Sequence, residues 1–249
     1  MLEVIVIAAA GVLGGAMNAV AGGGSFVTLP VLVAAGVPAL NANATNTVAL
    51  VPSALASAFA YRHDFKGFQD VTLLAMSIIS VIGGAIGAVL LLYTSQSLFD
   101  KMFPFLLLFG VLVFAFGRKL GEELRKRMTI HPRTLPAVQF VLGVYGGYFG
   151  GAVGVMMLAA WSVLTTAPIN TMQATRHLLN ASMNATASLL FLLGGLVYWK
   201  PMAVLLISST IGGYVASLFG RRLNPHRARM AISCLNAAIV VVVFWRRFG

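Results

Sequence analysis

Long apolar stretches alternate with short polar segments along the whole chain. The stretches that could cross a membrane are residues 1–20, 45–60, 70–93, 99–116, 175–193, 201–219 and 228–245, and residues 135–148 form a shorter apolar stretch. A helix needs roughly 20 residues to cross a bilayer. Strand-like alternation is absent, and lipid offers backbone N–H and C=O groups no partner, so the stretches predict helices. We therefore expect an all-α fold, a polytopic transmembrane helical bundle.

Two glycine-rich breaks interrupt this pattern. Gly22-Gly23-Gly24 separates the first apolar stretch from a short apolar run at residues 26–36, and Gly150-Gly151 precedes a similar run at residues 153–164. Both runs are too short to cross a bilayer alone. Because glycine tolerates backbone conformations that other residues avoid, each break predicts a glycine-broken helical hairpin.

The second half of the chain repeats the landmarks of the first in the same order. Three pairs recur at offsets of 132, 130 and 129 residues, namely Gly14-Gly15 with Gly146-Gly147, Ala44-Thr45 with Ala174-Thr175, and Gly83-Gly84 with Gly212-Gly213. Units of this length are typical of the duplicated halves of transporters. We predict a first transmembrane repeat at residues 1–117, a basic cytoplasmic linker at 118–133 and a second repeat at 134–249.

The basic residues indicate how the two halves are oriented. If each break is a hairpin turn, each half has an odd number of membrane segments and the halves are inverted. With the linker inside, most of the 17 Lys and Arg residues then lie on the cytoplasmic side. If each break lies within one bent span, the halves are parallel and fewer basic residues lie inside. The positive-inside rule favours the inverted arrangement, with the parallel one as the alternative.

Composition narrows the class of protein. Of the 249 residues 59% are hydrophobic and 9% are charged, whereas soluble domains carry about 25% charged residues. This is the composition of an integral membrane protein whose partner is the lipid bilayer. The net charge of +11 is gathered in short segments between apolar stretches, so we expect no nucleic acid as partner. A homodimer is compatible with the sequence, which leaves the oligomeric state open.

The breaks offer the chemistry of an anion site. Where a broken helix lines a cavity, its free N–H groups and the positive end of its dipole bind anions. The candidate residues around the two breaks are Asn18, Gly22, Gly23, Gly24, Ser25, Gly150 and Gly151. The alternative is that these glycines serve only tight helix packing.

A polar cluster follows each short apolar run and adds further candidates. The first cluster contains Asn43, Thr45, Asn46 and Thr47, and the second contains Thr175, Arg176 and His177. All of these except Thr47 are candidate substrate-binding residues. An arginine in the membrane plane pairs with an oxyanion or extends to the headgroups, and the histidine carries a proton or has no role. Helix capping is the alternative for the first cluster. Asn180 and Asn184 share a helix face and either line a pathway or link helices.

Missing features exclude other classes of protein. All six acidic residues lie at or near loops, which disfavours a cation transporter. The chain has no phosphate-binding loop of an ATPase and no hydrolase motif. A single cysteine, Cys234, excludes an internal disulfide and a cysteine metal site. We expect no enzyme, no catalytic residue, no metal and no cofactor.

The turn Gly22-Gly23-Gly24-Ser25-Phe26, with Leu29-Pro30 and Ala44-Thr45-Asn46 after it, resembles the TauE/SafE family of membrane permeases. Gly150-Gly151 and Ala174-Thr175-Arg176 fit the second half of that family, so the likeness spans nearly the whole chain. It implies movement of small sulfur-containing anions, such as sulfite, sulfonates or sulfoacetate, across the bacterial inner membrane. By resemblance, the residues around the substrate are Asn18, Gly23, Ser25, Thr45, Asn46, Gly151 and Thr175.

The second half departs from the first in ways that bear on the substrate. It lacks the full Gly-Gly-Gly-Ser, and it has Arg176-His177 where the first half has Asn46-Thr47. The site is then asymmetric and the identity of the anion stays open. The leading hypothesis is a secondary transporter for a small anion that works by alternating access. The alternatives are a channel-like anion pore and a membrane scaffold that transports nothing.

Overall fold

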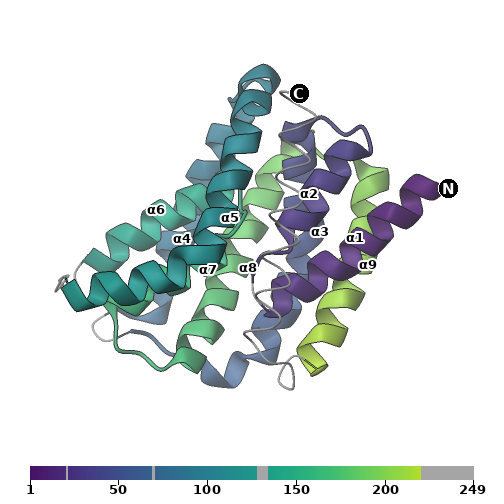
Figure 1. Cartoon of the computed structure of the whole chain (residues 1–249). Helices are drawn as coiled ribbons and strands as arrows, with labels where there is room; N and C mark the ends of the chain where they lie inside the picture. Colours follow the sequence, from purple (N-terminus) through teal and green to yellow (C-terminus); the bar gives the residue numbers. More distant parts are fainter. Residues whose placement is uncertain (21, 69–70, 128–133, 220–249) are drawn as a thin grey trace.

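A computed structural model of the chain describes residues 1–20, 22–68, 71–127 and 134–219. Figure 1 shows its helices, which are α1 (Leu2–Val20), α2 (Ser25–Ala34), α3 (Ala39–Ala60), α4 (Leu73–Leu92), α5 (Gln96–Arg127), α6 (Leu135–Tyr148), α7 (Val153–Leu164), α8 (Ile169–Leu193) and α9 (Trp199–Phe219). A 3₁₀ turn, Arg62–Asp64, follows α3. These described ranges contain no strand, which confirms the all-α prediction. The predicted span at residues 228–245 lies outside them.

Prolines determine where two of the helices begin. The residue before α3 is Pro38 and the residue before α8 is Pro168. Proline has no N–H to place in the helical ladder and favours the residue before it being extended, so both prolines suit a helix start. The sequence-based starts at residues 45 and 175 are therefore one to two turns late. The polar clusters lie inside the helices, and neither helix has a side-chain cap, so the capping interpretation is wrong.

Helix α5 is longer than the apolar stretch that predicted it. It continues through the basic residues to Arg127, so the first part of the predicted linker is helical rather than a loop. Long straight side chains such as Arg, Lys, Glu and Leu are good helix formers, which explains the continuation. Three described helices are long and apolar enough to cross a membrane by length and composition, in the ranges Leu2–Ala19, Leu73–Leu92 and Gln96–Gly117.

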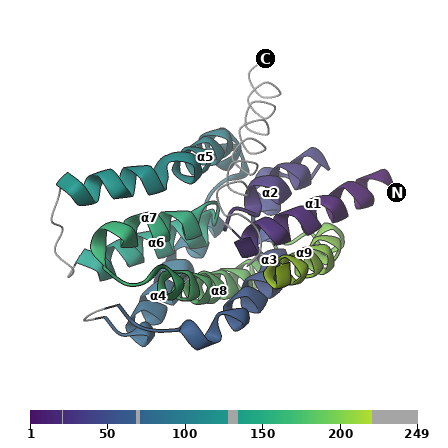
Figure 2. The same cartoon turned by 60° about the horizontal axis from the view of Figure 1, so that its bottom comes forward.

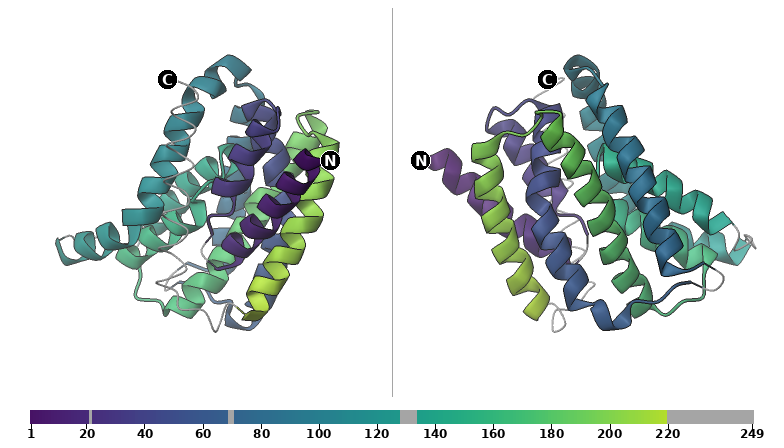
Figure 3. Two further views of the ribbon diagram at one scale, coloured as in Figure 1. Left: turned by 45° about the vertical axis from the view of Figure 1, so that its right-hand side comes forward. Right: turned by 180° about the vertical axis from the view of Figure 1, so that it is seen from behind.

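Four helices form a row through the centre of the molecule. Figure 3 shows α9, α3, α8 and α4 side by side in this order, and α3 packs on α9 and α8 while α8 packs on α4. Figure 2 shows α1, α2, α5, α6 and α7 on one side of the row. Large apolar side chains are exposed around the outside, among them Ile5, Phe59, Leu74, Phe105 and Leu193. Such an apolar exterior is suited to contact with lipid.

The two halves are packed into each other rather than placed side by side. Helix α1 packs along α9 of the second half, and α6 packs along α4 of the first. Glycines allow both close approaches, since a Cβ on Gly15 would strike the Ser209 backbone and one on Gly147 would strike the Gly84 backbone. In both pairs, a helix from one half of the chain packs along a helix from the other half.

Helices α3 and α8, which follow the short helices α2 and α7, run antiparallel. The rings of Tyr61 and His177 stack at one end of the pair, with centroids 5.1 Å apart. At the other end Asn41 Nδ2 donates to the carbonyl oxygen of Leu196 at 2.9 Å. The last residues of α3 thus meet the first turns of α8, and the first turns of α3 meet the residues after α8.

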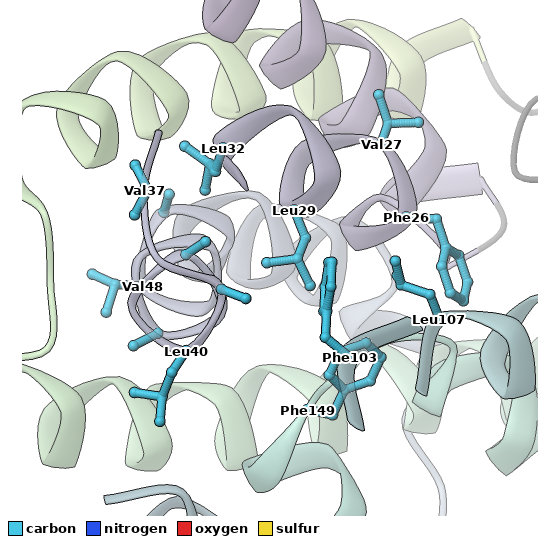
Figure 4. Close-up of a cluster of buried hydrophobic side chains, with 14 of the residues drawn as sticks. Phe26, Val27, Leu29, Leu32, Val37, Leu40, Val48, Phe103, Leu107 and Phe149 are labelled. Carbon is cyan, nitrogen blue, oxygen red and sulfur yellow. The ribbon is translucent and has the colours of Figure 1, made fainter. Parts of the chain in front are cut away.

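An apolar core joins the halves near the two breaks. Figure 4 shows Phe26 and Leu29 of α2 close to Leu107 and Phe103 of α5, with Phe149 of the second break against Phe103. Phe26 also packs edge-on against Phe114, with ring centroids 6.3 Å apart. This core holds the short helix α2 between α3 and α5, and so fixes where its N-terminus lies.

Candidate functional site

Both breaks are hairpin turns of the same kind. Gly22 has φ +78° and Gly150 has φ +73°, a left-handed conformation that glycine adopts without strain. The N–H of Gly22 donates to the carbonyl of Met17 at 3.0 Å, and that of Gly150 donates to the carbonyl of Tyr145 at 3.3 Å. In each case the turn closes onto the carbonyl five residues earlier and the next helix folds back, which confirms the predicted hairpins.

A small polar cavity lies where the two breaks and the central helix pair come together. It is lined by Asn18, Gly22 and Ser25 of the first break, Gly150 of the second, Thr47 and Leu50 of α3, and Asn180 and Asn184 of α8. Six of these eight residues are sequence candidates. The breaks are far apart in sequence, and the packing of the halves into each other brings them to one cavity.

Asn46 fixes the start of α2 at the cavity wall. Its Nδ2 donates to the Ser25 hydroxyl at 3.1 Å, and its Oδ1 accepts a hydrogen bond from Thr28 Oγ1. Asn46 is 2% exposed and Thr28 is fully buried. Because Ser25 Oγ accepts from Asn46, its hydrogen is free to point into the cavity. Asn46 thus acts behind the wall, by orienting Ser25.

Asn180 and Asn184 form the α8 side of the cavity. Asn184 Nδ2 donates to Asn180 Oδ1 at 3.1 Å, as their spacing of four residues predicts. Asn184 Oδ1 has no hydrogen-bond partner. The two amides bond to each other rather than across to another helix, so they stay available at the cavity surface.

Arg176 lies behind the cavity wall, between the two breaks. Its side chain is 2% exposed. A Cβ added to Gly154 would lie 3.1 Å from Nη1, and one added to Gly22 would collide with the same nitrogen. The guanidinium is therefore enclosed by glycines of both halves, and it does not extend to the headgroups. Its Nε has no hydrogen-bond partner, and among the described residues no carboxylate pairs with it.

His177 and Tyr61 cover one side of this arginine. Arg176 Nη2 lies 2.8 Å from His177 Nε2. A guanidinium only donates, so Nε2 accepts and the imidazole is neutral. His177 is 4% exposed, and its ring stacks on the ring of Tyr61 at the end of α3. The histidine is thus a buried partner of the arginine rather than an interfacial side chain.

Thr45 and Thr175 lie away from the cavity and tie each half to a loop of the other. Thr45 Oγ1 accepts from the N–H of Tyr198 at 3.0 Å, and Thr175 Oγ1 donates to the carbonyl of Lys66 at 3.1 Å. Asn43 likewise bonds to the backbone of the other half, where its Nδ2 donates to the Tyr148 carbonyl at 2.8 Å. These three candidates hold the halves together and do not line the cavity.

The remaining candidate glycines serve close packing. A Cβ on Gly23 would lie 3.0 Å from the Phe114 ring, and one on Gly151 would lie 2.6 Å from the Phe149 ring. A Cβ on Gly24 would strike the backbone of Gly14. Gly23, Gly24 and Gly151 therefore allow close packing, as the alternative interpretation predicted, whereas Gly22 and Gly150 line the cavity.

Two lining residues were not among the sequence candidates. Thr47 belongs to the first polar cluster, and its hydroxyl donates to the Asn43 carbonyl at 2.9 Å. Leu50 follows it by three residues and so lies on the same helix face. That spacing singles out Thr47 once the helix start is known, but an apolar Leu50 carries no sequence signal.

The sequence is similar to those of known proteins. A family model described as sulfite exporter TauE/SafE matches residues 7–243. A probable membrane transporter protein of Haemophilus influenzae is 33% identical over 79% of this chain and 76% of its own. Probable membrane transporter protein YfcA of Escherichia coli K12 is 36% identical over 82% of this chain and 76% of its own. No solved structure matches the chain.

Proposed function

The chain belongs to the sulfite exporter TauE/SafE family of membrane transporters, and from that premise we propose that it is a secondary transporter for a small anion. The substrate occupies the cavity between the two breaks and reaches either side of the membrane by alternating access. Sulfite or a sulfonate is the proposed substrate, in keeping with the family description. The proposed location is the inner membrane of a bacterium, as a multi-pass protein.

One observation carries this proposal. Residues of both glycine breaks, Gly22 and Gly150, line the same cavity together with the amides of α8. Transporters built from two repeats place the substrate at the repeat interface, next to the ends of broken helices. A pocket serving only one half would not require both turns to meet.

The direction of the helices supports two inverted repeats, residues 1–117 and 134–249. Equivalent helices of parallel repeats point the same way, whereas those of inverted repeats point in opposite ways. The equivalent helices α3 and α8 contact each other antiparallel, as the Tyr61–His177 and Asn41–Leu196 contacts require. Alternating access then follows from rocking each half against the other. The hydrogen bonds of Thr45 and Thr175 connect the halves at corresponding places.

The proposed site has two kinds of residue. Ser25, Asn180 and Asn184 offer hydrogen-bond donors at the cavity surface, and the positive charge of Arg176 stands behind Gly22. Donors close to a fixed positive charge suit an oxyanion. Asn46 and His177 orient these groups without reaching the cavity themselves.

The test is transport by the purified protein in liposomes loaded with sulfite or methanesulfonate. We expect saturable uptake and counterflow exchange, which a channel-like pore does not give. Asn184→Leu should reduce uptake at least tenfold, because it removes from the cavity the one amide N–H that Asn184 does not donate to Asn180. Ser182→Ala is the matched control on the same helix, since the Ser182 hydroxyl only donates to the Leu179 carbonyl. Liposomes that move no anion, or full activity in Asn184→Leu, would contradict the proposal.

A further inference from the structure

We propose that the cavity selects singly charged anions over doubly charged ones. This inference rests on the proposed function and adds the charge of the substrate to it. It follows from the fixed charges that surround the cavity, and it distinguishes hydrogensulfite and simple sulfonates from the sulfite dianion, sulfate and sulfoacetate.

Arg176 supplies one full positive charge to the site. The guanidinium is 2% exposed and lies against Gly22, a residue of the cavity wall. Its only polar side-chain contact among the described residues is the neutral His177, at 2.8 Å. Among the described acidic residues, Glu3, Asp64 and Glu123 are exposed, and the half-buried Asp100 accepts a hydrogen bond from Gln96 Nε2 at 2.7 Å. The charge of Arg176 is thus unbalanced within the described bundle.

The wall itself adds no second charge. All eight lining residues are neutral, and their polar groups are amides, hydroxyls and backbone. The helix ends add little, because each break joins the C-terminal end of one helix to the N-terminal end of the next. Their partial charges are opposite in sign and offset each other. The formal charge at and beside the cavity is therefore +1, from Arg176 alone among the described residues.

Charge matching decides which anion is held best. A buried charge is strongly disfavoured unless it is paired. A monoanion in the cavity balances Arg176 and leaves no net charge. A dianion leaves one excess negative charge in a site where neutral donors alone must replace its water. It also carries the larger hydration cost on entry, so its affinity falls below that of a monoanion of the same shape.

Methanesulfonate and sulfate are the probes, because both are tetrahedral and differ in charge. The thermal stability of the detergent-purified protein is measured against each salt at constant pH and ionic strength. We expect the concentration that gives half of the maximal stabilisation to be at least tenfold lower for methanesulfonate than for sulfate. Equal half-saturation, or tighter binding of sulfate, would overturn the charge inference and leave anion transport standing. A response to neither anion would overturn the proposed function as well.

A charge added to the wall gives an independent test that leaves Arg176 intact. Leu50→Lys brings a second positive charge to the cavity, so the affinity ratio of sulfate to methanesulfonate should rise at least tenfold. Leu50→Met has nearly the same length without charge and should keep the wild-type ratio. If Leu50→Lys leaves the ratio unchanged while both anions still bind, the charge count does not control selectivity and the inference fails.

Discussion

Gly22 meets two constraints at once, one from its own backbone and one from the other half of the molecule. Its φ of +78° favours glycine, and a Cβ there would collide with Arg176 Nη1. Gly36 shares the first constraint only, since its φ is +86° and nothing lies within 4 Å of its missing Cβ. Comparing substitutions at Gly22 and Gly36 therefore separates the effect of the positive φ from the effect of the contact with Arg176.

We predict that Gly22→Ala destabilises the protein more than Gly36→Ala. Both changes force alanine into a left-handed conformation, at about 1–2 kcal/mol. Gly22→Ala adds overpacking against the guanidinium, typically a further 1–3 kcal/mol. Thermal or denaturant unfolding of the purified proteins in detergent measures the difference.

The second half of that test is a double-mutant cycle. In an Arg176→Ala background the cost of Gly22→Ala should fall to that of Gly36→Ala, because the colliding side chain is gone. An unchanged cost in that background would show that the turn alone demands glycine at this position.

The sequence was informative about residues whose constraint is local. Glycine repeats and the spacing of Asn180 and Asn184 identified six of the eight lining residues. It could not place Arg176 behind the wall, because its neighbours Gly22 and Gly154 come from different halves and meet only in the fold. It also could not separate Asn46, which orients Ser25, from residues that line the cavity directly.

At the scale of elements, helix pairs depend on glycines where backbones touch. Gly147 of α6 lies against Gly84 of α4, and a Cβ there would strike the Gly84 carbonyl. Gly117 of α5 is different, because its nearest neighbour would be the Val113 side chain at 3.2 Å. A side chain can shift by a few tenths of an ångström where a backbone in a packed pair cannot.

We predict that Gly147→Ala lowers the free energy of unfolding by about 1–3 kcal/mol through overpacking. Gly117→Ala should lie within about 1 kcal/mol of the wild type, because the helical preference of alanine offsets its tighter contact. Gly15→Ala, at the equivalent place in α1, should behave like Gly147→Ala. Unfolding in detergent compares all three, and a neutral Gly147→Ala would show that α4 and α6 can separate at no cost.

Helix boundaries show what patterning predicts well and what it does not. The ranges of α6 and α7 follow the apolar stretches closely, because a charged segment precedes α6 and the glycine break precedes α7. The starts of α3 and α8 were predicted wrongly because they were placed where the apolar stretches begin. The helices in fact begin directly after Pro38 and Pro168. Polar residues such as Asn43 and Asn46 sit inside a helix because the other half covers them.

At the scale of the whole molecule, the proposed inverted arrangement would place corresponding loops of the two halves on opposite sides of the membrane. His63, after α3, and Lys200, in the first turn of α9, are both exposed. In a Cys234→Ser background, we predict that a membrane-impermeant thiol reagent labels Lys200→Cys from the outside. His63→Cys should react only after the membrane is opened.

Intact and permeabilised cells provide the comparison, and a cysteine at Tyr93, an exposed residue after α4, is the outside control. Labelling of His63→Cys and Lys200→Cys from the same side would indicate parallel repeats. It would contradict the proposed inverted arrangement.

The packing of α1 on α9 also has a consequence for biosynthesis. Helix α1 is made long before α9, which begins at Trp199 and covers Gly11 and Gly15 of α1 with Ser208 and Ser209. Translation proceeds at roughly 5–20 residues per second, so α1 waits on the order of ten seconds or more for its partner. The first half cannot complete its own fold before the second is made, and a nascent chain truncated before α9 is expected to be a substrate for quality-control proteases.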